Sequence, residues 1–167
     1  MPYLLIQNIA RFIVLMLIQV LVLNNVQFLG FINPYIYVLF IISLPVKTPR
    51  WFSLILAFAL GITMDIFTNT LGLHAFACVL VAFLRNPLIK IFALNEDNID
   101  FTPSFSTFRT KADYVKYVFI IVLIHHFTLY YMEVFSFVNF WTTAYRALIS
   151  SLITISIILG IQLLGKK

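Results

Sequence analysis

The sequence predicts an all-α integral membrane protein that crosses a lipid bilayer about six times. The first observation behind this prediction is composition: 62% of the 167 residues are hydrophobic, only 10% are charged, and the mean hydropathy is +1.03. Soluble domains are usually about 45–50% apolar and about 25% charged. A folded chain of this size still exposes about 30% of its surface, so the apolar excess must face lipid.

The second observation is how the charges are distributed. The net charge is +5, but the basic residues stand singly or in small groups between long apolar stretches. Nucleic-acid-binding proteins gather such charges on one face, so the lipid bilayer is expected as the environment and no nucleic acid as a partner. The only cysteine, Cys78, excludes an internal disulfide and is expected to be a small buried hydrophobe.

The first two helices are predicted at 9–29 and 34–44. No charged residue occurs between Phe12 and Val46, which is too long a stretch for one helix of roughly 20 residues and suits two. The break is expected near Gly30–Asn33, because asparagine is a good N-cap and proline suits the following position. The second helix is short, so we expect it to be tilted or only partly inserted.

Four further helices are predicted at 51–67, 73–92, 114–135 and 143–164. Trp51 follows a basic loop as an interface anchor, and Pro87 is expected to bend or end the fourth helix. An aromatic belt precedes the last helix, at Phe137, Phe140 and Trp141. The whole chain, 1–167, is expected to be a single transmembrane domain.

The loop at 95–113 is the only extended polar segment. It carries three phenylalanines at helix-like spacing beside two basic residues: Phe101, Phe105, Phe108, Arg109 and Lys111. The loop is either a docking site for a cytoplasmic partner or a segment lying on the inner leaflet with its aromatic side down. Pro103 interrupts any regular helix, which favours the second interpretation.

Orientation follows from the basic residues, which concentrate in cytoplasmic loops of membrane proteins. With six spans and a cytoplasmic N-terminus, only Arg146 falls on the outer side. The inner side then holds Arg11, Lys47, Arg50, Arg85, Lys90, Arg109, Lys111, Lys116, Lys166 and Lys167. Both termini are therefore predicted in the cytoplasm.

Asp65 is the first candidate functional residue, because an ionisable side chain near the bilayer centre costs roughly 2.5–3.5 kcal/mol. It lies about 21 Å along its helix from Trp51, in the outer half of the bilayer. Ala57, Gly61 and Asp65 are spaced by four. We therefore expect one helix face of small residues that packs closely against a neighbouring helix, with Asp65 bonded to a polar partner at its outer end.

Glu133 and Arg146 are expected at a similar depth to Asp65. An ion pair or shared network among these three side chains would offset their burial, with Asn69 and His74 as alternative partners for Asp65. The other interpretation is that Glu133 and Arg146 reach the lipid headgroups.

His125 and His126 are predicted near the middle of the fifth helix. His126, Tyr130 and Glu133 share one face. His126 and Glu133 are two turns apart, which is too far to share a metal ion, and a site needs three or four ligands. Interhelical hydrogen bonding is favoured over a proton relay, and no metal or cofactor is expected.

The last helix carries small residues four apart. These pairs predict close-packing faces, within the chain or toward a partner: Ala147 and Ser151, Ser150 and Thr154, Ser156 and Gly160. No metalloprotease, nucleophile-elbow or phosphate-binding motif occurs in the sequence, so catalysis is not expected.

The stretch 61–75 resembles the signature of the rod shape-determining protein MreD family. That family has a glycine four residues before an intramembrane aspartate, then a short outer turn and Leu-Gly, here Gly61, Asp65 and Gly72. Gln19, Pro34 and the stretch 125–135 are also similar to its pattern. Tyr35 departs from it, because many members have an acidic residue there.

The resemblance implies a non-catalytic scaffold of bacterial cell elongation in the cytoplasmic membrane, which helps to organise lateral peptidoglycan synthesis. Its implied partner is the single-span protein MreC, within an assembly that links MreB to RodA and a penicillin-binding transpeptidase. The implied fold is similar to the substrate-binding subunits of energy-coupling-factor vitamin transporters.

Two alternatives stay open. A vitamin-binding transport subunit would share the fold, but such subunits usually carry Ala-x-x-x-Ala on the first helix, where this chain has only Ala10. An intramembrane enzyme that uses His125 or His126 is the weakest alternative.

Overall fold

The computed structural model describes residues 2–25, 32–93, 102–135 and 138–164. The regular secondary structure in these residues is helical, and an isolated β-bridge joins Ala93 to Phe108. The elements in order are α1 (Pro2–Ile18), the π-helix η1 (Gln19–Leu23), α2 (Val38–Ile42), α3 (Arg50–Thr68), α4 (Leu73–Phe92), α5 (Lys111–Val134) and α6 (Phe140–Leu164).

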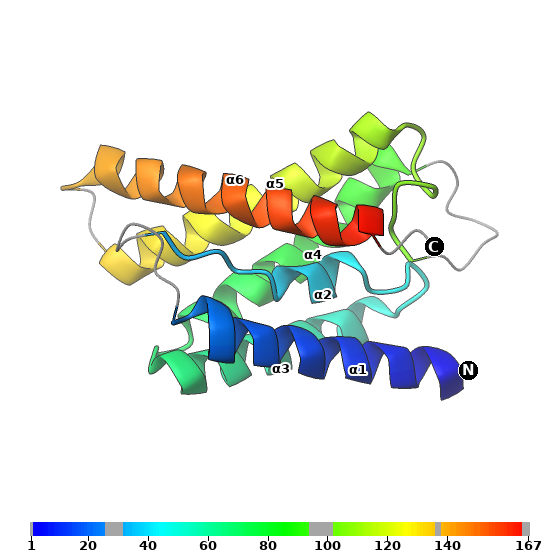
Figure 1. Ribbon diagram of the computed structural model, residues 1–167, viewed down its shortest axis with the longest axis horizontal. Coiled ribbons are helices and arrows are strands. Elements are labelled where there is room, and N and C mark those ends of the chain that lie inside the picture. Colours follow the sequence, from blue (N-terminus) through cyan, green and yellow to red (C-terminus); the bar gives the residue numbers. More distant parts are fainter. Residues whose placement is uncertain (1, 26–31, 94–101, 136–137, 165–167) are drawn as a thin grey trace.

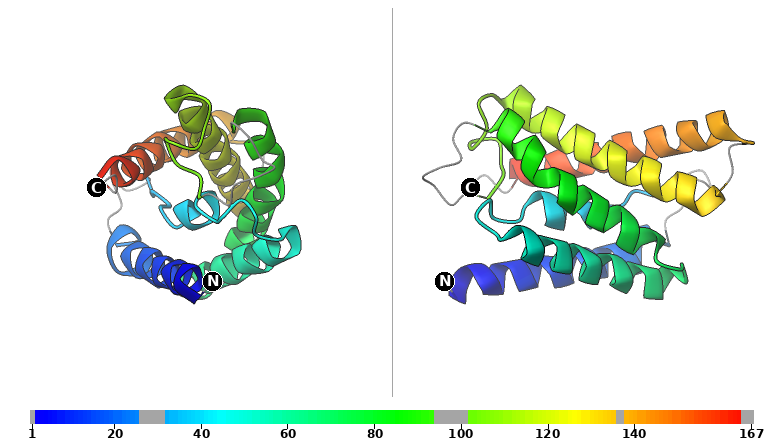
Figure 2. Two further views of the ribbon diagram at one scale, coloured as in Figure 1. Left: turned by 90° about the vertical axis from the view of Figure 1, so that its right-hand side faces the viewer. Right: turned by 180° about the vertical axis from the view of Figure 1, so that it is seen from behind.

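The long helices form a ring around the segment 32–44, which we call the central segment. Viewed end-on, α1, α3, α4, α5 and α6 surround it (Figure 2). Its residues from Tyr35 to Leu44 are all buried. Successive long elements alternate in direction, and α1 begins at the same end of the bundle where α6 ends (Figure 1). We call this the basal end, and the end that holds the α3–α4 turn the distal end.

Four helices, α3 to α6, are long and apolar enough to cross a membrane. A shorter apolar helix, Gln7–Leu23, precedes them. The first helix thus ends earlier than the predicted 9–29, and Gly30 lies outside the described residues. So do Phe101, Phe137, Lys166 and Lys167, on which parts of the predicted loop, belt and charge pattern depend.

The ring presents apolar side chains outward. On α3, Ile55, Phe58 and Ile66 are more than half exposed, whereas Ala57 and Gly61 on the opposite face are buried. Water would disfavour such a surface, and lipid would not. The inside of the bundle holds the polar groups, which is the arrangement a membrane requires.

The central segment is less helical than predicted. Only Val38–Ile42 forms a helix, and the backbone before it is irregular. Side chains of neighbouring elements satisfy this backbone instead: the amide of Gln19 donates to the Pro34 carbonyl at 3.0 Å and accepts from the Ile36 N–H at 2.9 Å. The Tyr35 N–H donates to Thr154 Oγ1 at 3.1 Å. These bonds hold the backbone after Asn33 and Pro34 in an irregular conformation, so the helix does not begin there as predicted.

The basal end of the central segment is held by three donors from three helices. Arg11 donates to the Ser43 carbonyl at 3.0 Å and Tyr117 to the Ile42 carbonyl at 3.3 Å. Arg85, inside α4, donates to the Leu44 carbonyl and is fully buried. Irregular backbone at membrane depth is tolerated where protein groups satisfy it, as here.

Helix α4 spans the predicted 73–92, and Pro87 lies inside it without ending it. One smaller prediction needs correction. In the described part of the 95–113 loop, Phe108 is buried and its ring lies 5.1 Å from that of Tyr117. Phe105 packs on Tyr114, with 4.7 Å between ring centroids. These aromatic side chains find ring partners on α5 and so do not lie on the lipid surface.

Candidate functional site

The closest helix contact in the site is between Gly61 of α3 and the start of α4. A Cβ placed on Gly61 would lie 2.6 Å from the Ala75 nitrogen and 2.7 Å from the His74 carbonyl oxygen, and also against the Ala75 Cα. Real Cβ atoms essentially never approach that closely. Only glycine therefore allows the backbone of α4 to lie directly on α3 at this point.

Asp65 lies one turn beyond Gly61 and caps α4. One carboxylate oxygen accepts from the His74 N–H at 3.0 Å and the Thr70 hydroxyl at 2.5 Å, and the other accepts from the Ala75 N–H at 2.9 Å. The first amides of a helix lack intrahelical partners, and the helix dipole favours a negative charge there. These groups explain how a buried carboxylate is tolerated without the predicted ion pair to Arg146.

The turn between α3 and α4 needs two left-handed residues. Asn69 ends α3 at φ 56°, and Gly72 precedes α4 at φ 82°. Glycine adopts this region without strain, and asparagine is the residue that tolerates it next best. Gly61, Asp65 and Gly72 thus form one structural unit, which brings the start of α4 back onto α3.

A buried cluster of rings joins the central segment to α4 and α5. The Tyr37 hydroxyl oxygen lies 2.6 Å from His74 Nδ1 and 2.9 Å from His125 Nε2. The Tyr35 ring packs between His74 and His126, with centroid distances of 5.4 Å and 5.3 Å. All these side chains are buried.

His126 joins α5 to α6, as the interhelical hydrogen-bonding interpretation expects. Its Nδ1 donates to the Val122 carbonyl at 2.9 Å, and its Nε2 lies 3.1 Å from Thr154 Oγ1. One turn further along, the hydroxyls of Tyr130 and Ser150 are 2.8 Å apart. Within the described residues, no three of the His, Cys, Asp and Glu side chains are grouped as metal ligands.

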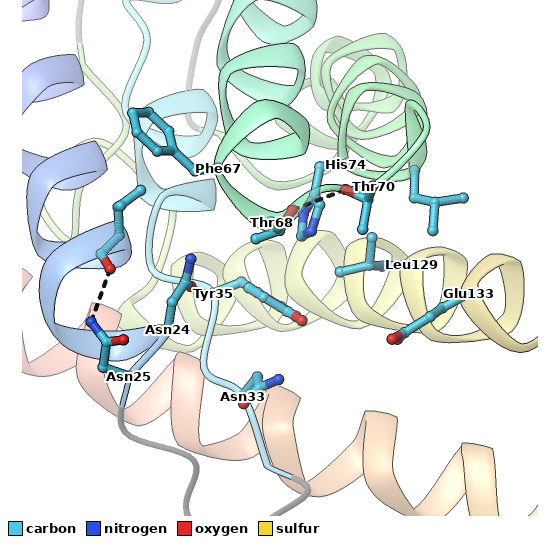
Figure 3. Close-up of a pocket in the computed structure, with 12 residues that line it drawn as sticks. Asn24, Asn25, Asn33, Tyr35, Phe67, Thr68, Thr70, His74, Leu129 and Glu133 are labelled. Atoms are coloured by element: carbon cyan, nitrogen blue, oxygen red, sulfur yellow. Dashed lines mark hydrogen bonds between the residues drawn. The ribbon is translucent and has the colours of Figure 1, made fainter.

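A polar cavity of about 400 Å³ opens at the distal end, between η1, the start of the central segment, the α3–α4 turn and α5. His74 and Tyr35 lie against it, and Glu133 points its carboxylate into it (Figure 3). Three asparagines and two threonines complete its polar lining: Asn24, Asn25, Asn33, Thr68 and Thr70.

Glu133 and Arg146 are not joined to Asp65. Arg146 lies over the Tyr130 ring, 5.8 Å from its centroid, and its buried Nε has no hydrogen-bond partner. Glu133 is exposed at the cavity. Asp65 is instead fully engaged at α4, so the predicted three-residue network does not form.

The small-residue faces of α6 point in different directions. Ala147, Ser150, Ser151 and Thr154 are buried inside the bundle. Ser156 is exposed, and a Cβ on Gly160 would meet no atom within 4 Å. Ser156 and Gly160 therefore do not serve packing within this chain.

A groove of about 670 Å³ runs between α1 and α6 in the basal half of the bundle. Apolar side chains of both helices line it, among them Val14, Ile18 and Ile161. Its polar lining includes Ser43 and Gln162, whose side chains are 3.4 Å apart. The loop residues Thr102, Pro103, Ser104 and Ser106 also line it.

Several residues of the site were missed as functional candidates. Tyr37, Arg85 and Tyr117 are all fully buried, and each donates to or contacts a group on another element. When a tyrosine, or an arginine near a helix end, occurs in an apolar stretch, the sequence does not show whether it bonds another element inside the bundle or anchors the helix at the membrane interface. Gln19 had a signal, because an amide in an apolar helix must find a partner.

Apolar outer surfaces, a hydrogen-bonded polar interior and four helices of membrane-spanning length define a helical membrane protein. The sequence profile of the rod shape-determining protein MreD family matches residues 3–164, so the chain belongs to the MreD family. Neither a curated protein nor a solved structure matches it. The family is one of shape-determining structural proteins and implies a role in rod shape determination.

Proposed function

We propose that this protein is a non-catalytic scaffold in the bacterial cytoplasmic membrane that binds the transmembrane helix of an MreC-type partner. Through that partner it would help to organise lateral peptidoglycan synthesis with RodA, a penicillin-binding transpeptidase and, indirectly, MreB. Membership of the MreD family supports the role in rod shape. Both termini and the basal end would face the cytoplasm, and the distal end the outside.

The observation that carries this proposal is the groove between α1 and α6. Its walls are apolar side chains at membrane depth, where Val14 is 52% exposed and Ile161 42% exposed. Its polar lining includes the Ser43 and Gln162 side chains. Lipid chains cannot hydrogen-bond to these groups, whereas a helix with a small or polar residue can.

The described part of the 95–113 loop supports the same proposal. Thr102, Pro103 and Ser104 line the basal end of the groove. The loop is held there by the packing of Phe105 and Phe108 on α5. A partner helix in the groove would therefore meet this loop where the helix leaves the membrane, as the docking interpretation of the loop requires.

Co-purification tests the proposal. The full chain and an MreC-type partner from the same genome would be expressed together and purified in a mild detergent. We expect a stable complex in size-exclusion chromatography. Elution of the two proteins apart, with both folded, would contradict the proposal.

The alternative, a vitamin-binding transport subunit, is supported by the cavity at the distal end. It would require a coupling protein, and α1 offers only Ala10 of the Ala-x-x-x-Ala pattern. Such a subunit should gain thermal stability with a vitamin and should not bind the MreC-type partner. The similarity of fold to those subunits stays a prediction.

A further inference from the structure

The distal cavity has features that partner binding does not use. It lies at the opposite end of the bundle from the groove, and no lining residue is shared between the two. Its volume of about 400 Å³ falls within the range of roughly 300–1,000 Å³ that is usual for small-molecule sites. Its lining is unusual for a membrane protein's interior because most of it is polar.

The hydrogen bonds behind the cavity determine which nitrogen of His74 carries the proton. Nδ1 of His125 is buried without a partner. Because a buried N–H without an acceptor is rare, a neutral His125 carries its proton on Nε2 and donates to the Tyr37 oxygen. Tyr37 then donates its one hydroxyl proton to His74 Nδ1, 2.6 Å away. His74 is left with Nε2–H as a donor for a molecule in the cavity.

Among the described residues that line the cavity, Glu133 is the only acidic or basic one with a formal charge. The carboxylate points into the cavity (Figure 3), and it makes no hydrogen bond or ion pair with the described part of the chain. No lysine or arginine is among the lining residues, since Arg146 is directed to the Tyr130 ring. A cation is therefore favoured and an anion is disfavoured.

Asn33 adds a buried acceptor. Its Oδ1 is buried and has no hydrogen-bond partner among the described residues, although such atoms usually have one. A hydroxyl group on a bound molecule would supply the missing donor. The amides of Asn24 and Asn25 and the hydroxyls of Thr68 and Thr70 offer further polar contacts in the lining.

We propose that this cavity binds a small polyhydroxylated molecule that carries a protonated amine. The ammonium group would pair with Glu133, a hydroxyl would donate to Asn33 Oδ1, and an oxygen would accept from His74 Nε2–H. The Tyr35 ring, which is 7% exposed and lines the cavity, would support the apolar face of the molecule. Binding would be reversible and involves no covalent step.

Three soluble probes of nearly the same shape test the charge requirement on the full-length protein in detergent. Glucosamine carries the amine, glucose lacks it, and glucosamine 6-phosphate adds an anion. We expect glucosamine to bind at least about tenfold more tightly than glucose in calorimetry, as a charge-assisted contact implies. Glucosamine 6-phosphate should bind no better than glucose. Equal affinity for all three probes, or no binding in any condition, would contradict the proposal.

The Glu133→Gln variant locates the charge requirement. Glu133 is exposed and has no packing role, so the variant should fold. We expect it to bind glucosamine and glucose equally. The Asp113→Asn variant is the matched control, because it removes one acidic charge at the basal end, where Asp113 bonds Thr110 and Lys116. A loss of glucosamine preference in this control as well would contradict a contact with Glu133.

A lipid headgroup could supply the same amine, so a second experiment must distinguish a lipid from a free molecule as the source of that amine. The protein would be placed in nanodiscs of phosphatidylglycerol with or without phosphatidylethanolamine. Weaker glucosamine binding with phosphatidylethanolamine, and loss of this competition in Glu133→Gln, would show that a lipid amine occupies the contact with Glu133 and would contradict a polyhydroxylated occupant. Unchanged glucosamine binding would identify a free molecule. Competition that persists in Glu133→Gln would contradict the site.

Discussion

The carboxylate of Asp65 accepts the backbone N–H of Ala75 at 2.9 Å, across the contact between α3 and α4. This bond is available because Gly61, one turn earlier, lets the two backbones meet. The glycine and the aspartate therefore have one purpose: the first allows the approach, and the second satisfies the amides that the approach brings near.

Replacing Gly61 by alanine tests the close approach. The new Cβ would collide with the backbone of α4, which cannot move as a flexible side chain would. We expect a loss of about 1–3 kcal/mol in unfolding free energy, the usual cost of overpacking. The measurement is thermal unfolding in detergent, followed by the fluorescence of Trp51 and Trp141. Gly160→Ala is the control, since that Cβ meets open space and should leave stability unchanged or slightly raised.

Replacing Asp65 by alanine tests the cap. The Thr70 hydroxyl and the N–H groups of His74 and Ala75 would lose their acceptor. Each unsatisfied buried group costs about 1–3 kcal/mol, so we expect a large fall in melting temperature, and a smaller one for Asp65→Asn. Asp113→Asn, at a half-buried position where the new amide oxygen can still accept from the Thr110 hydroxyl, should have a smaller effect. An Asp65→Ala variant as stable as this control would disprove the capping role.

Gln19→Leu tests how the central segment is held. The variant leaves the Pro34 carbonyl and the Ile36 N–H buried without partners. We expect a loss of about 2–6 kcal/mol, from two groups at about 1–3 kcal/mol each, and faster amide exchange at Ile36. Gln162→Leu removes only a 3.4 Å contact and is the matched control. Equal stability of the two variants would argue against the account.

Tyr37→Phe tests the buried ring cluster. The variant removes the hydroxyl that contacts both His74 and His125, while the ring stays in place. We expect a stability loss of about 1–3 kcal/mol and a change in the ring-nitrogen NMR shifts of both histidines. Tyr145→Phe, at a residue that is 58% exposed, should change neither. Unchanged histidine shifts in Tyr37→Phe would exclude the hydrogen bonds.

The sequence predicted α3 to α6 closely because charges and turn residues mark their ends. It placed Gly61 and Asp65 on one packing face and named His74 as an alternative partner of Asp65, but it did not show that the backbone amides of His74 and Ala75 are the donors, since backbone amides carry no sequence signal. It made the central segment too helical, because the competing bonds come from Gln19 and Thr154, far away in the chain. The structural role of Arg85 was missed for a similar reason: its acceptor is a carbonyl of that same segment.

The hydrogen bond of His126 could be predicted from the sequence better than the distal cavity or the faces of α6. His126 has a hydrogen-bond partner on α6, which follows from the need of any buried imidazole. The vitamin-transporter alternative implied an outer cavity, but the lining of the cavity was not predicted, because it comes from elements well separated in the sequence. The direction of Ser156 and Gly160 also depends on the rotation of α6, which small residues alone do not determine.

The central claim is that a partner helix occupies the groove between α1 and α6, and photocrosslinking in living cells tests it most directly. A photoreactive residue would be placed at Val14 and Ile161 in the groove, and at Ile55 and Phe58 on the exposed face of α3. We predict crosslinks to the MreC-type protein from the two groove positions and not from α3. Crosslinks from α3 with none from the groove would contradict the claim.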